Sequence, residues 1–397
     1  MPKTLRSFRS LPRRGMRRRW WLFRPGDWIA RFLPVLKPKR GLMIVRLDGI
    51  GDMVLFRPTL DSYAEAFGIP RSDITIVGCK SWAGLTDIAF AGYRVIAIDE
   101  HAFERRAWYR LRIALLIRWQ NPKTTVCDMF FRKAIAADSL VWLSGAAETI
   151  VSRPYISAAT EAEFDYYLAR FTRVIDTGAY PVHETIRHFR FISAIAGQSI
   201  TPLTPSIVWR DQPPPIDEGR PYVVLNFGSN EYGRRWPFAS YLDIAEQLLD
   251  HGFRVAFVGA AGESDVHEQL RYRLNRPGVI DLIGRTSLPE LLDLLRYAAG
   301  MVSNDTGPAH LGIAIGTPTL VIVGGGHFGS FVPYPETICP PNAHFINVEM
   351  DCYHCYWRCH KRATKFDVFP CVAGVPTEAV WQKVSDMLEL PASQAAE

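Results

Sequence analysis

The chain has 397 residues, of which 48% are hydrophobic, 12% aromatic and 22% charged, and its formal net charge is +6. This composition excludes a disordered or collagen-like chain. No stretch approaches the roughly 18 uninterrupted apolar residues of a membrane-spanning helix, so the sequence predicts a protein that folds in water, with two or three domains at about 100 to 200 residues each.

The first forty residues differ in character from the rest of the chain. Residues 1–40 carry 13 Lys and Arg against one acidic residue, Asp27, so the +6 total leaves −6 for residues 41–397. Aromatic residues such as Trp20 and Trp21 lie among these arginines, a mixture that suits an anionic membrane surface. We predict a basic aromatic segment over 1–40 that contacts such a surface; a solvated disordered tail, a nucleic-acid arm and an organelle presequence are the alternatives.

From residue 42 on, short apolar runs alternate with longer helical segments. The pattern predicts buried strands over 42–47, 73–78, 94–98 and 124–127, and helices near 53–67, 81–90 and 104–118. Strands alternating with helices are typical of a parallel sheet with helical crossovers. The alternation predicts a first α/β domain over residues 41–200.

The loop over residues 46–55 leaves the first predicted strand and leads into a helix. Gly49 and Gly51 allow a tight turn and a close approach to a ligand, but the third glycine of a dinucleotide-binding fingerprint is absent, which disfavours a dehydrogenase. Asp52 is at the expected N-cap and would also point a carboxylate out of the carboxyl end of the sheet, although capping alone would explain it. Asp48 is the competing carboxylate, with a hydrogen-bonding role in the loop as its simpler interpretation.

A proline-rich linker is predicted over residues 201–220, after which the alternation resumes. It predicts strands over 222–226, 254–258 and 318–323, and helices over 238–251, 262–274, 288–299 and 307–315. We expect a second α/β domain over 221–397. Two open α/β domains joined by a linker predict parallel sheets facing across a cleft, with ligands at the carboxyl ends of the strands.

A second polar loop, residues 227–241, follows the first strand of this second domain. Gly228 and Ser229 supply flexibility, and Arg234 and Arg235 supply positive charge just before a helix. Two arginines there would neutralise a diphosphate through bidentate hydrogen bonds; a solvated surface pair is the alternative.

A third polar turn spans residues 303–318. Asp305 or Thr306 caps the following helix, and Gly307 admits a close approach. The free N–H groups and the positive dipole end at such a helix start suit a phosphate. His310 lies one turn into the helix on the same face as Thr306; a core histidine satisfied by a neighbour is the alternative.

Four of the seven cysteines cluster near the end of the chain, at Cys352, Cys355, Cys359 and Cys371. Four thiols within twenty residues would close a tetrahedral zinc site, but the spacing matches neither the common zinc ribbons nor the ferredoxin pattern. A structural zinc ion, packed free thiols, and disulfide or cluster chemistry remain the hypotheses. Seven cysteines without an export signal predict a reducing, cytoplasmic location.

Five segments, in their order, resemble glycosyltransferase family 9, the bacterial ADP-heptose:lipopolysaccharide heptosyltransferases. They are RLDGIGDMVLFRPTL, HETIRHFRFISAIAG, RRWPFASYLDIAEQL, DLIGRTSLPELLDLL and SNDTGPAHLGIAIGTP. The resemblance spans roughly residues 42–385. It implies a GT-B fold of two Rossmann-like domains, with the donor nucleotide mainly on the second and the acceptor glycolipid on the first.

The resemblance also implies roles for individual residues. Asp52 corresponds to the general base of the family, and Arg234 to the basic residue that contacts the donor phosphates. The donor turn corresponds to Asp305, Thr306, Gly307 and His310, and Glu263 falls near the ribose contact. Family members invert the anomeric configuration and need no metal, so no cofactor is expected.

These observations predict an inverting, metal-independent glycosyltransferase that moves heptose or a related sugar from a nucleoside-diphosphate sugar, ADP-heptose in the family, to a lipopolysaccharide-type or other glycan acceptor. Gly324-Gly325-Gly326-His327 stands where the family commonly has Gly-Pro-Thr, close to the expected sugar site, which leaves the donor sugar open. We expect peripheral association with the cytoplasmic face of the inner membrane through residues 1–40, and no nucleic-acid partner. A nucleotide-binding oxidoreductase and a non-catalytic sugar-nucleotide-binding module are the alternatives.

Overall fold

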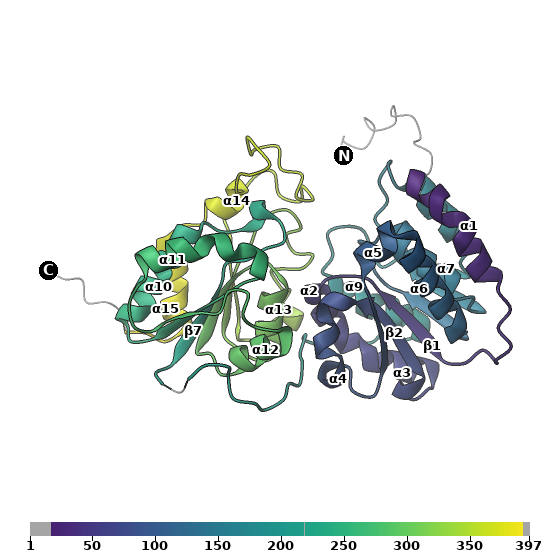
Figure 1. Ribbon diagram of the computed structural model, residues 1–397, viewed down its shortest axis with the longest axis horizontal. Coiled ribbons are helices and arrows are strands. Elements are labelled where there is room, and N and C mark those ends of the chain that lie inside the picture. The colour runs from purple at the N-terminus through teal and green to yellow at the C-terminus, as the bar shows by residue number, and fades with distance from the viewer. Residues whose placement is uncertain (1–16, 218, 392–397) are drawn as a thin grey trace.

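Two parallel six-stranded sheets organise the computed structural model, which describes residues 17–217 and 219–391. The sheets lie in two halves of the molecule placed side by side (Figure 1). The strand order is β3-β2-β1-β4-β5-β6 in the first sheet and β12-β11-β10-β7-β8-β9 in the second. This confirms the predicted α/β class with two Rossmann-like sheets. Each order reverses once, between β1 and β4 and between β7 and β10, and such switch points bind ligands at the carboxyl ends of the strands.

The first half contains the elements up to α9. Its strands are β1 Leu42–Arg46, β2 Ile74–Cys79, β3 Arg94–Ile98, β4 Thr124–Cys127, β5 Glu148–Ser152 and β6 Arg173–Ile175. Its helices are α1 Arg18–Phe32, α2 Ile50–Phe56, α3 Leu60–Phe67, α4 Thr86–Ala89, α5 Glu100–Arg105, α6 Ala107–Gln120, α7 Ser139–Leu143, α8 Glu161–Leu168 and α9 Glu184–Ala196. Short turns of 3-10 or π helix occupy Arg57–Thr59, Arg71–Asp73, Lys80–Leu85 and Ala134–Asp138.

The second half begins at β7. Its strands are β7 Tyr222–Asn226, β8 Arg254–Val258, β9 Val279–Asp281, β10 Gly300–Asn304, β11 Thr319–Ile322 and β12 Ala343–Ile346. Its helices are α10 Phe238–Asp250, α11 His267–Arg273, α12 Leu288–Arg296, α13 Gly307–Ala314, α14 Pro370–Ala373 and α15 Thr377–Met387. Turns of 3-10 helix lie at Tyr232–Arg234, Ala261–Val266 and Glu336–Ile338.

The seven predicted strands are all present, within one or two residues of their predicted ends. The helix predicted over 53–67 is divided by the 3-10 turn that contains Pro58, because proline has no N–H to continue the hydrogen-bond ladder. The helix predicted near 104–118 is preceded by a separate short helix, since Arg106 between them is extended.

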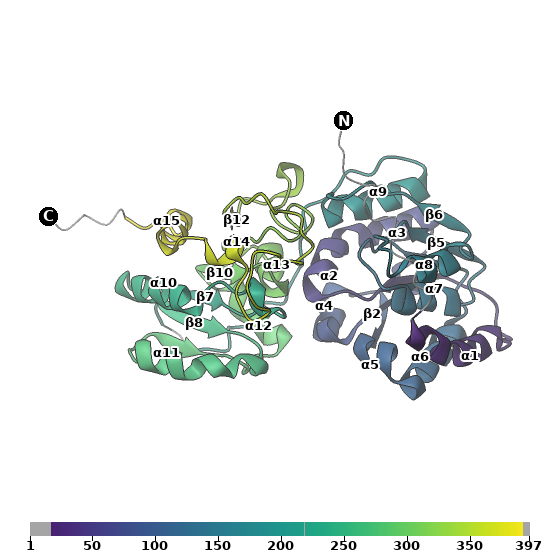
Figure 2. The ribbon, with the colours of Figure 1, turned by 90° about the horizontal axis from the view of Figure 1, so that it is seen from above.

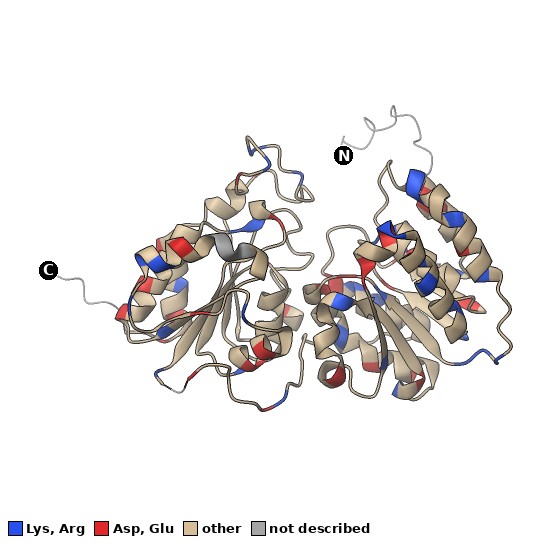
Figure 3. Cartoon of the chain, viewed as in Figure 1, with Lys and Arg blue, Asp and Glu red and all other residues tan. Residues whose placement is uncertain are grey.

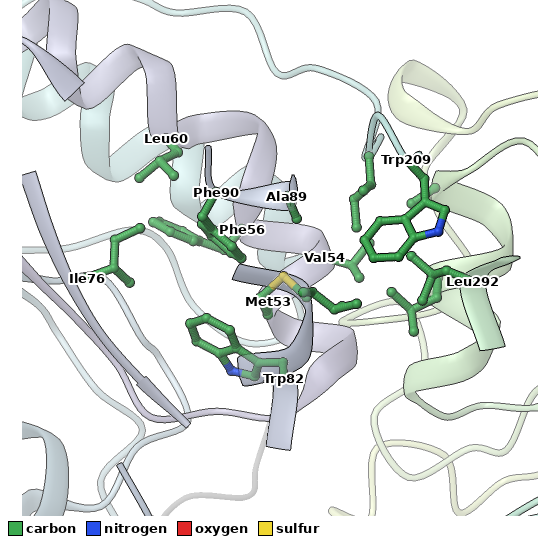
Figure 4. Close-up of a cluster of buried hydrophobic side chains, with 14 of the residues drawn as sticks. Met53, Val54, Phe56, Leu60, Ile76, Trp82, Ala89, Phe90, Trp209 and Leu292 are labelled. Atoms are coloured by element: carbon green, nitrogen blue, oxygen red, sulfur yellow. The ribbon is translucent and has the colours of Figure 1, made fainter. Parts of the chain in front are cut away.

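An apolar junction joins the two halves. Met53, Val54 and Trp82 of the first half belong to the same buried cluster as Leu292 of α12. Trp209 of the linker segment is buried beside Leu292 and faces Val54 (Figure 4), and its indole N–H donates to Asp293 Oδ1 at 2.7 Å. The linker segment is therefore fixed against the second half.

The N-terminal segment is a folded helix where the structure describes it. Helix α1 lies beside α6 in both views (Figures 1 and 2), and its Trp20 and Phe23 side chains are buried. Asp27 accepts two hydrogen bonds from the Arg110 guanidinium, at 2.8 and 2.7 Å. Residues 18–32 thus form a packed helix, in contrast to the disordered-tail alternative, while residues 1–16 lie outside the described part.

None of the helices in the described ranges has the length and apolar character needed to cross a membrane.

Candidate active site

A cavity of about 490 Å³ opens between the two halves at the carboxyl ends of both sheets. The first half contributes the loop after β1 and Ser81 after β2, and the second half contributes the loops that follow β7, β8, β10 and β11. The lining includes Gly49, Gly51, Asp52, Gly228, Ser229, Arg234, Asp305, Thr306, Gly307 and His310. Ten of the residues singled out from the sequence therefore surround one cavity, of the size that binds a small molecule.

The two halves approach each other closely where α2 and α13 begin. A Cβ atom on Gly51 would lie 2.7 Å from Cδ2 of His310, and one on Gly307 would lie 2.9 Å from Cβ of Ile50. Glycine at both positions lets the two helix starts meet at the cavity. The loop after β1 and the turn after β10 are thus neighbours in space.

Asp52 lies at the third position of α2, so the prediction that it is the N-cap is wrong. Gly49 is the N-cap, and its N–H donates to Asp52 Oδ2 at 3.2 Å. Burial raises the pKa of Asp52; the positive charge of Arg46 opposes this shift and the carboxylate of Asp305 adds to it. Asp52 therefore holds a proton more readily than an exposed aspartate does.

A buried ionic network lies behind this loop. Arg46 pairs with Asp48, and its Nη1 donates to Asp128 Oδ1 at 2.6 Å. Burial raises the pKa of Asp48 to about 7, against the opposing charge of Arg46. Asp48 is thus half of an ion pair and does not line the cavity, which leaves Asp52 as the carboxylate on this side.

Arg234 and Asp305 form a pair on the opposite wall. Arg234 Nη2 donates to Asp305 Oδ2 at 2.9 Å, and the guanidinium lies 4.6 Å from the centroid of the Trp357 ring. Its Nε is buried and has no hydrogen-bond partner within residues 17–217 and 219–391. A fixed guanidinium with one unused donor is suited to an anionic ligand.

The second arginine of the loop has a different role from the one predicted. The Arg235 Nε and Nη2 atoms donate to the carbonyl oxygen of Ser229, at 3.1 and 2.9 Å. Arg235 therefore shapes the loop, and only Arg234 of the predicted pair lines the cavity.

The turn after β10 presents the start of α13 to the cavity. Thr306 is the extended N-cap residue, without a side-chain capping bond. His310 Nδ1 lies 2.7 Å from the Tyr334 hydroxyl, and burial lowers the pKa of His310 to about 4. His310 is thus a neutral imidazole with a partner, and it also lines the cavity. Glu263 lies in the turn Ala261–Val266, but its side chain is outside the described part.

Sequence reasoning missed one part of the cavity wall, Trp357, which comes from the segment 350–371. Trp357 lines the cavity together with His327 and Phe331. Its ring lies so close to the backbone that a Cβ on Gly326 would be 2.2 Å from Cδ2 of Trp357. Trp357 therefore explains Gly324 and Gly326, while a Cβ on Gly325 would lie 2.2 Å from Cδ1 of Tyr353. This glycine run was the available sequence signal.

Aromatic contacts of the same segment join the two halves. Tyr356 packs on Tyr155 and Tyr180 of the first half, with ring centroids 4.9 and 4.7 Å apart. The start of α9 makes a further connection, because the Glu184 N–H donates to the Ser330 carbonyl at 2.8 Å. Tyr356 and Ser330 of the second half therefore both contact the first half beside the cavity.

The four clustered cysteines line a much smaller cavity of about 10 Å³ next to Trp357 and Phe369. All four are free thiols, and burial raises the pKa values of Cys355 and Cys371. Over the described ranges, no group of three or more His, Cys, Asp or Glu side chains is arranged to hold a metal ion. As placed, these four thiols do not form the tetrahedral arrangement of the predicted zinc site.

Comparison with known proteins agrees with this geometry. A family model described as glycosyltransferase family 9 (heptosyltransferase) matches residues 200–355. Lipopolysaccharide heptosyltransferase 1 of Pseudomonas aeruginosa is 25% identical over 289 residues, which cover 71% of this chain and 78% of that protein.

Two similar solved structures share the fold. A family 9 glycosyl transferase from Veillonella parvula has a TM-score of 0.71 at 16% identity, over 90% of this chain and 100% of that one. TibC of enterotoxigenic Escherichia coli, described as an iron-containing dodecameric glycosyltransferase, has a TM-score of 0.53 at 15% identity, over 90% of this chain and 77% of that one. TibC has also been solved in complex with ADP-D-beta-D-heptose, at a TM-score of 0.52.

These matches confirm the predicted GT-B fold. They favour a glycosyltransferase over the oxidoreductase and the non-catalytic binding module. The resemblance to glycosyltransferase family 9 is thereby confirmed, with the family model matching residues 200–355, and the protein is a glycosyltransferase.

Proposed function

We propose that this enzyme transfers heptose or a closely related sugar from a nucleoside-diphosphate donor, ADP-heptose in the first instance, to a glycolipid acceptor of the lipopolysaccharide type. The observation that carries the proposal is the single cavity in which Asp52 of one half lies opposite Arg234 and the start of α13 in the other. The name of the Pseudomonas relative and the ADP-heptose complex of TibC support this donor and acceptor.

The second half would hold the donor diphosphate. Arg234, whose Nε has no hydrogen-bond partner in the described ranges, lines the same cavity as Thr306 and Gly307 at the start of α13. As the bond to the sugar breaks, negative charge gathers on the leaving diphosphate, and these fixed positive groups stabilise it. Asp305 keeps the guanidinium in place.

Asp52 would act as the general base. It takes the proton from the acceptor hydroxyl while that oxygen attacks the anomeric carbon on the face opposite the diphosphate. Burial raises the pKa of Asp52, which increases the affinity of its carboxylate for the hydroxyl proton.

The same arrangement supports inversion of configuration. Among the cavity-lining side chains that the structure describes, the carboxylates are Asp52 and Asp305, and Asp305 is held by Arg234. A double displacement needs a second carboxylate as nucleophile, so we propose a single displacement, which inverts. Because Arg234 and the helix start supply positive charge at the leaving group, the proposed reaction uses no divalent cation.

We also propose that the enzyme works as a peripheral protein at the cytoplasmic face of the inner membrane. A lipid-linked acceptor is confined to the bilayer, so an enzyme held there meets it more often. The basic character of residues 17–40 supports this location.

The test is to offer the purified enzyme a panel of nucleoside-diphosphate sugars and to measure the released diphosphate, with and without a deacylated lipopolysaccharide core as acceptor. We expect acceptor-dependent ADP release with ADP-heptose. Acceptor-dependent turnover with another nucleotide and not with ADP-heptose would overturn the donor assignment.

A further inference from the structure

Exposed apolar side chains are concentrated at one edge of the molecule. Of seventeen exposed large hydrophobic residues in the described ranges, eleven belong to α1, the segment 33–36 after it, and α6. They are Trp21, Leu22, Trp28, Ile29, Phe32, Leu33, Leu36, Trp108, Leu115, Leu116 and Trp119. We call this surface the α1–α6 face. Single exposed apolar residues are normal, whereas such a concentration marks an interaction site.

The fold holds the α1–α6 face in place. The inner side of α1 is fixed by the buried Asp27–Arg110 pair and by Arg24, whose guanidinium lies 4.1 Å from the centroid of the Trp142 ring. Trp21, Trp28 and Phe32 then point outward at helical spacing. The opposite side of α1 packs into the core of the protein, so only the outward side is available to contact a partner.

Helix α6 completes the surface. The segment after α1 and α6 enclose an apolar groove of about 640 Å³, lined by Leu33, Val35, Trp108, Leu111, Leu115, Leu116 and Trp119 with Arg112 and Arg118. Trp108 is 84% exposed and Trp119 is 61% exposed. The surface therefore spans two helices separated by more than 70 residues in sequence.

Residues 17–40 and α6 carry basic side chains and no exposed acidic side chain. Residues 17–40 contain eight Lys and Arg, and their single acid, Asp27, is buried against Arg110. Helix α6 contains no acidic residue. Figure 3 shows Lys and Arg along α1 and the loop that follows it. Exposed Lys37 also lies 5.2 Å from the Trp119 ring centroid.

We infer that the α1–α6 face docks on an anionic lipid bilayer, with its tryptophans at the level of the headgroups and its basic side chains on the lipid phosphates. Tryptophan and arginine side chains together are typical of membrane interfaces, and the positive rim complements an anionic surface. The inference deepens the proposed function, on which its biological purpose rests, by adding α6 to the predicted membrane contact of residues 1–40 and by identifying the side chains that enter the interface.

The test measures co-flotation of the full chain with phosphatidylcholine vesicles that contain or lack phosphatidylglycerol. One double variant changes α6, Trp108→Ser with Trp119→Ser, and another changes α1, Trp21→Ser with Ile29→Ser. The matched control, Tyr272→Ser with Phe366→Ser, removes aromatic rings that are 91% and 70% exposed elsewhere. We expect binding to anionic vesicles that each face variant lowers by about tenfold or more and that the control leaves unchanged.

Other outcomes overturn the inference. An α6 variant that floats like the wild type would remove α6 from the surface. A wild-type dimer that both face variants dissociate, without vesicle binding, would assign the surface to a second copy of the chain, and binding to an oligonucleotide in place of vesicles would assign it to nucleic acid. Thermal unfolding verifies that each variant is folded, and ADP release on a water-soluble acceptor reports the proposed function separately.

Discussion

The substitution Asp52→Asn tests the proposed chemistry at one atom. An amide has the size of a carboxylate and still accepts the Gly49 N–H bond that now measures 3.2 Å, so the start of α2 should keep its shape. It cannot take a proton from the acceptor hydroxyl. General-base catalysis contributes about 100-fold to 10,000-fold, so kcat should fall by that factor, equivalent to about 3 to 5 kcal/mol of activation free energy.

The donor should bind the variant almost as well as the wild type, because the proposed diphosphate contacts, Arg234 and the start of α13, belong to the other half. The assay pairs calorimetric titration of ADP with rates of ADP release at saturating acceptor. Asp48→Asn is the matched control, since Asp48 pairs with Arg46 outside the cavity; it should lower stability and largely keep kcat. A kcat near wild type for Asp52→Asn, or an equal loss of donor affinity and kcat, would refute the reasoning.

Four further predictions follow from the same contacts. Since burial raises the pKa of Asp52 and the base must be unprotonated, activity should fall as the pH drops through a pKa above the ordinary aspartate value of about 3.9; a pH–rate profile with its acid limb at or below that value would contradict this. Arg234→Ala should weaken ADP binding by about 10-fold to 100-fold, the value of a charge-assisted hydrogen bond of about 1.5 to 3 kcal/mol, measured by calorimetry; unchanged affinity would place the diphosphate elsewhere. Trp357→Leu removes the ring under Arg234, a contact worth about 0.5 to 2 kcal/mol, so the donor KM should rise several-fold at unchanged acceptor KM, and a change confined to the acceptor KM would count against that position. Asp27→Ala leaves Arg110 buried without its partner, which should cost about 3 to 5 kcal/mol of unfolding free energy in urea denaturation; a loss below about 1 kcal/mol would mean that α1 is not anchored there.

Much of the sheet architecture could be predicted because buried strands have a strong local signal. β1, β2 and β8 are runs of apolar and β-branched residues between polar loops, and each was located. β6 and β9 are three residues long and only partly buried, so no run distinguishes them. The partner of a short strand along the sheet is a tertiary property and has no local signal.

The residues of the candidate site likewise differ in whether they have a local sequence signal. Asp52 was found because it follows a predicted strand, and the carboxyl ends of parallel strands meet at one edge of a sheet. The turn around Gly307 was found from its capping residues and its glycine. Trp357 was missed because its segment is irregular, with a φ of 58° at Trp357 itself, and the contact with Gly326 joins residues without any periodic pattern. Arg234 bonds to Asp305 and Arg235 to the Ser229 carbonyl, and residue type alone does not determine which partner each arginine takes.

The packing of the N-terminal helix α1 is another feature that the sequence predicted only in part. Charge and aromatic content indicated a membrane contact in residues 1–40, but the packing of α1 on α6 depends on Asp27 and Arg110, which are 83 residues apart. Pairings over such separations are set by the tertiary fold. The extension of the apolar surface onto Trp108 and Trp119 therefore became apparent only from the structure.

One measurement tests the central claim most directly, namely that both walls of the cavity act on one donor and one acceptor in a single displacement. The purified enzyme is given ADP-heptose and a deacylated core acceptor, with a chelator present, and the anomeric configuration of the new linkage is read by proton NMR as ADP release is followed. The account predicts one ADP per linkage formed, inverted configuration, and loss of both in Asp52→Asn. A product with retained configuration, or turnover that the chelator abolishes and a divalent cation restores, would contradict it.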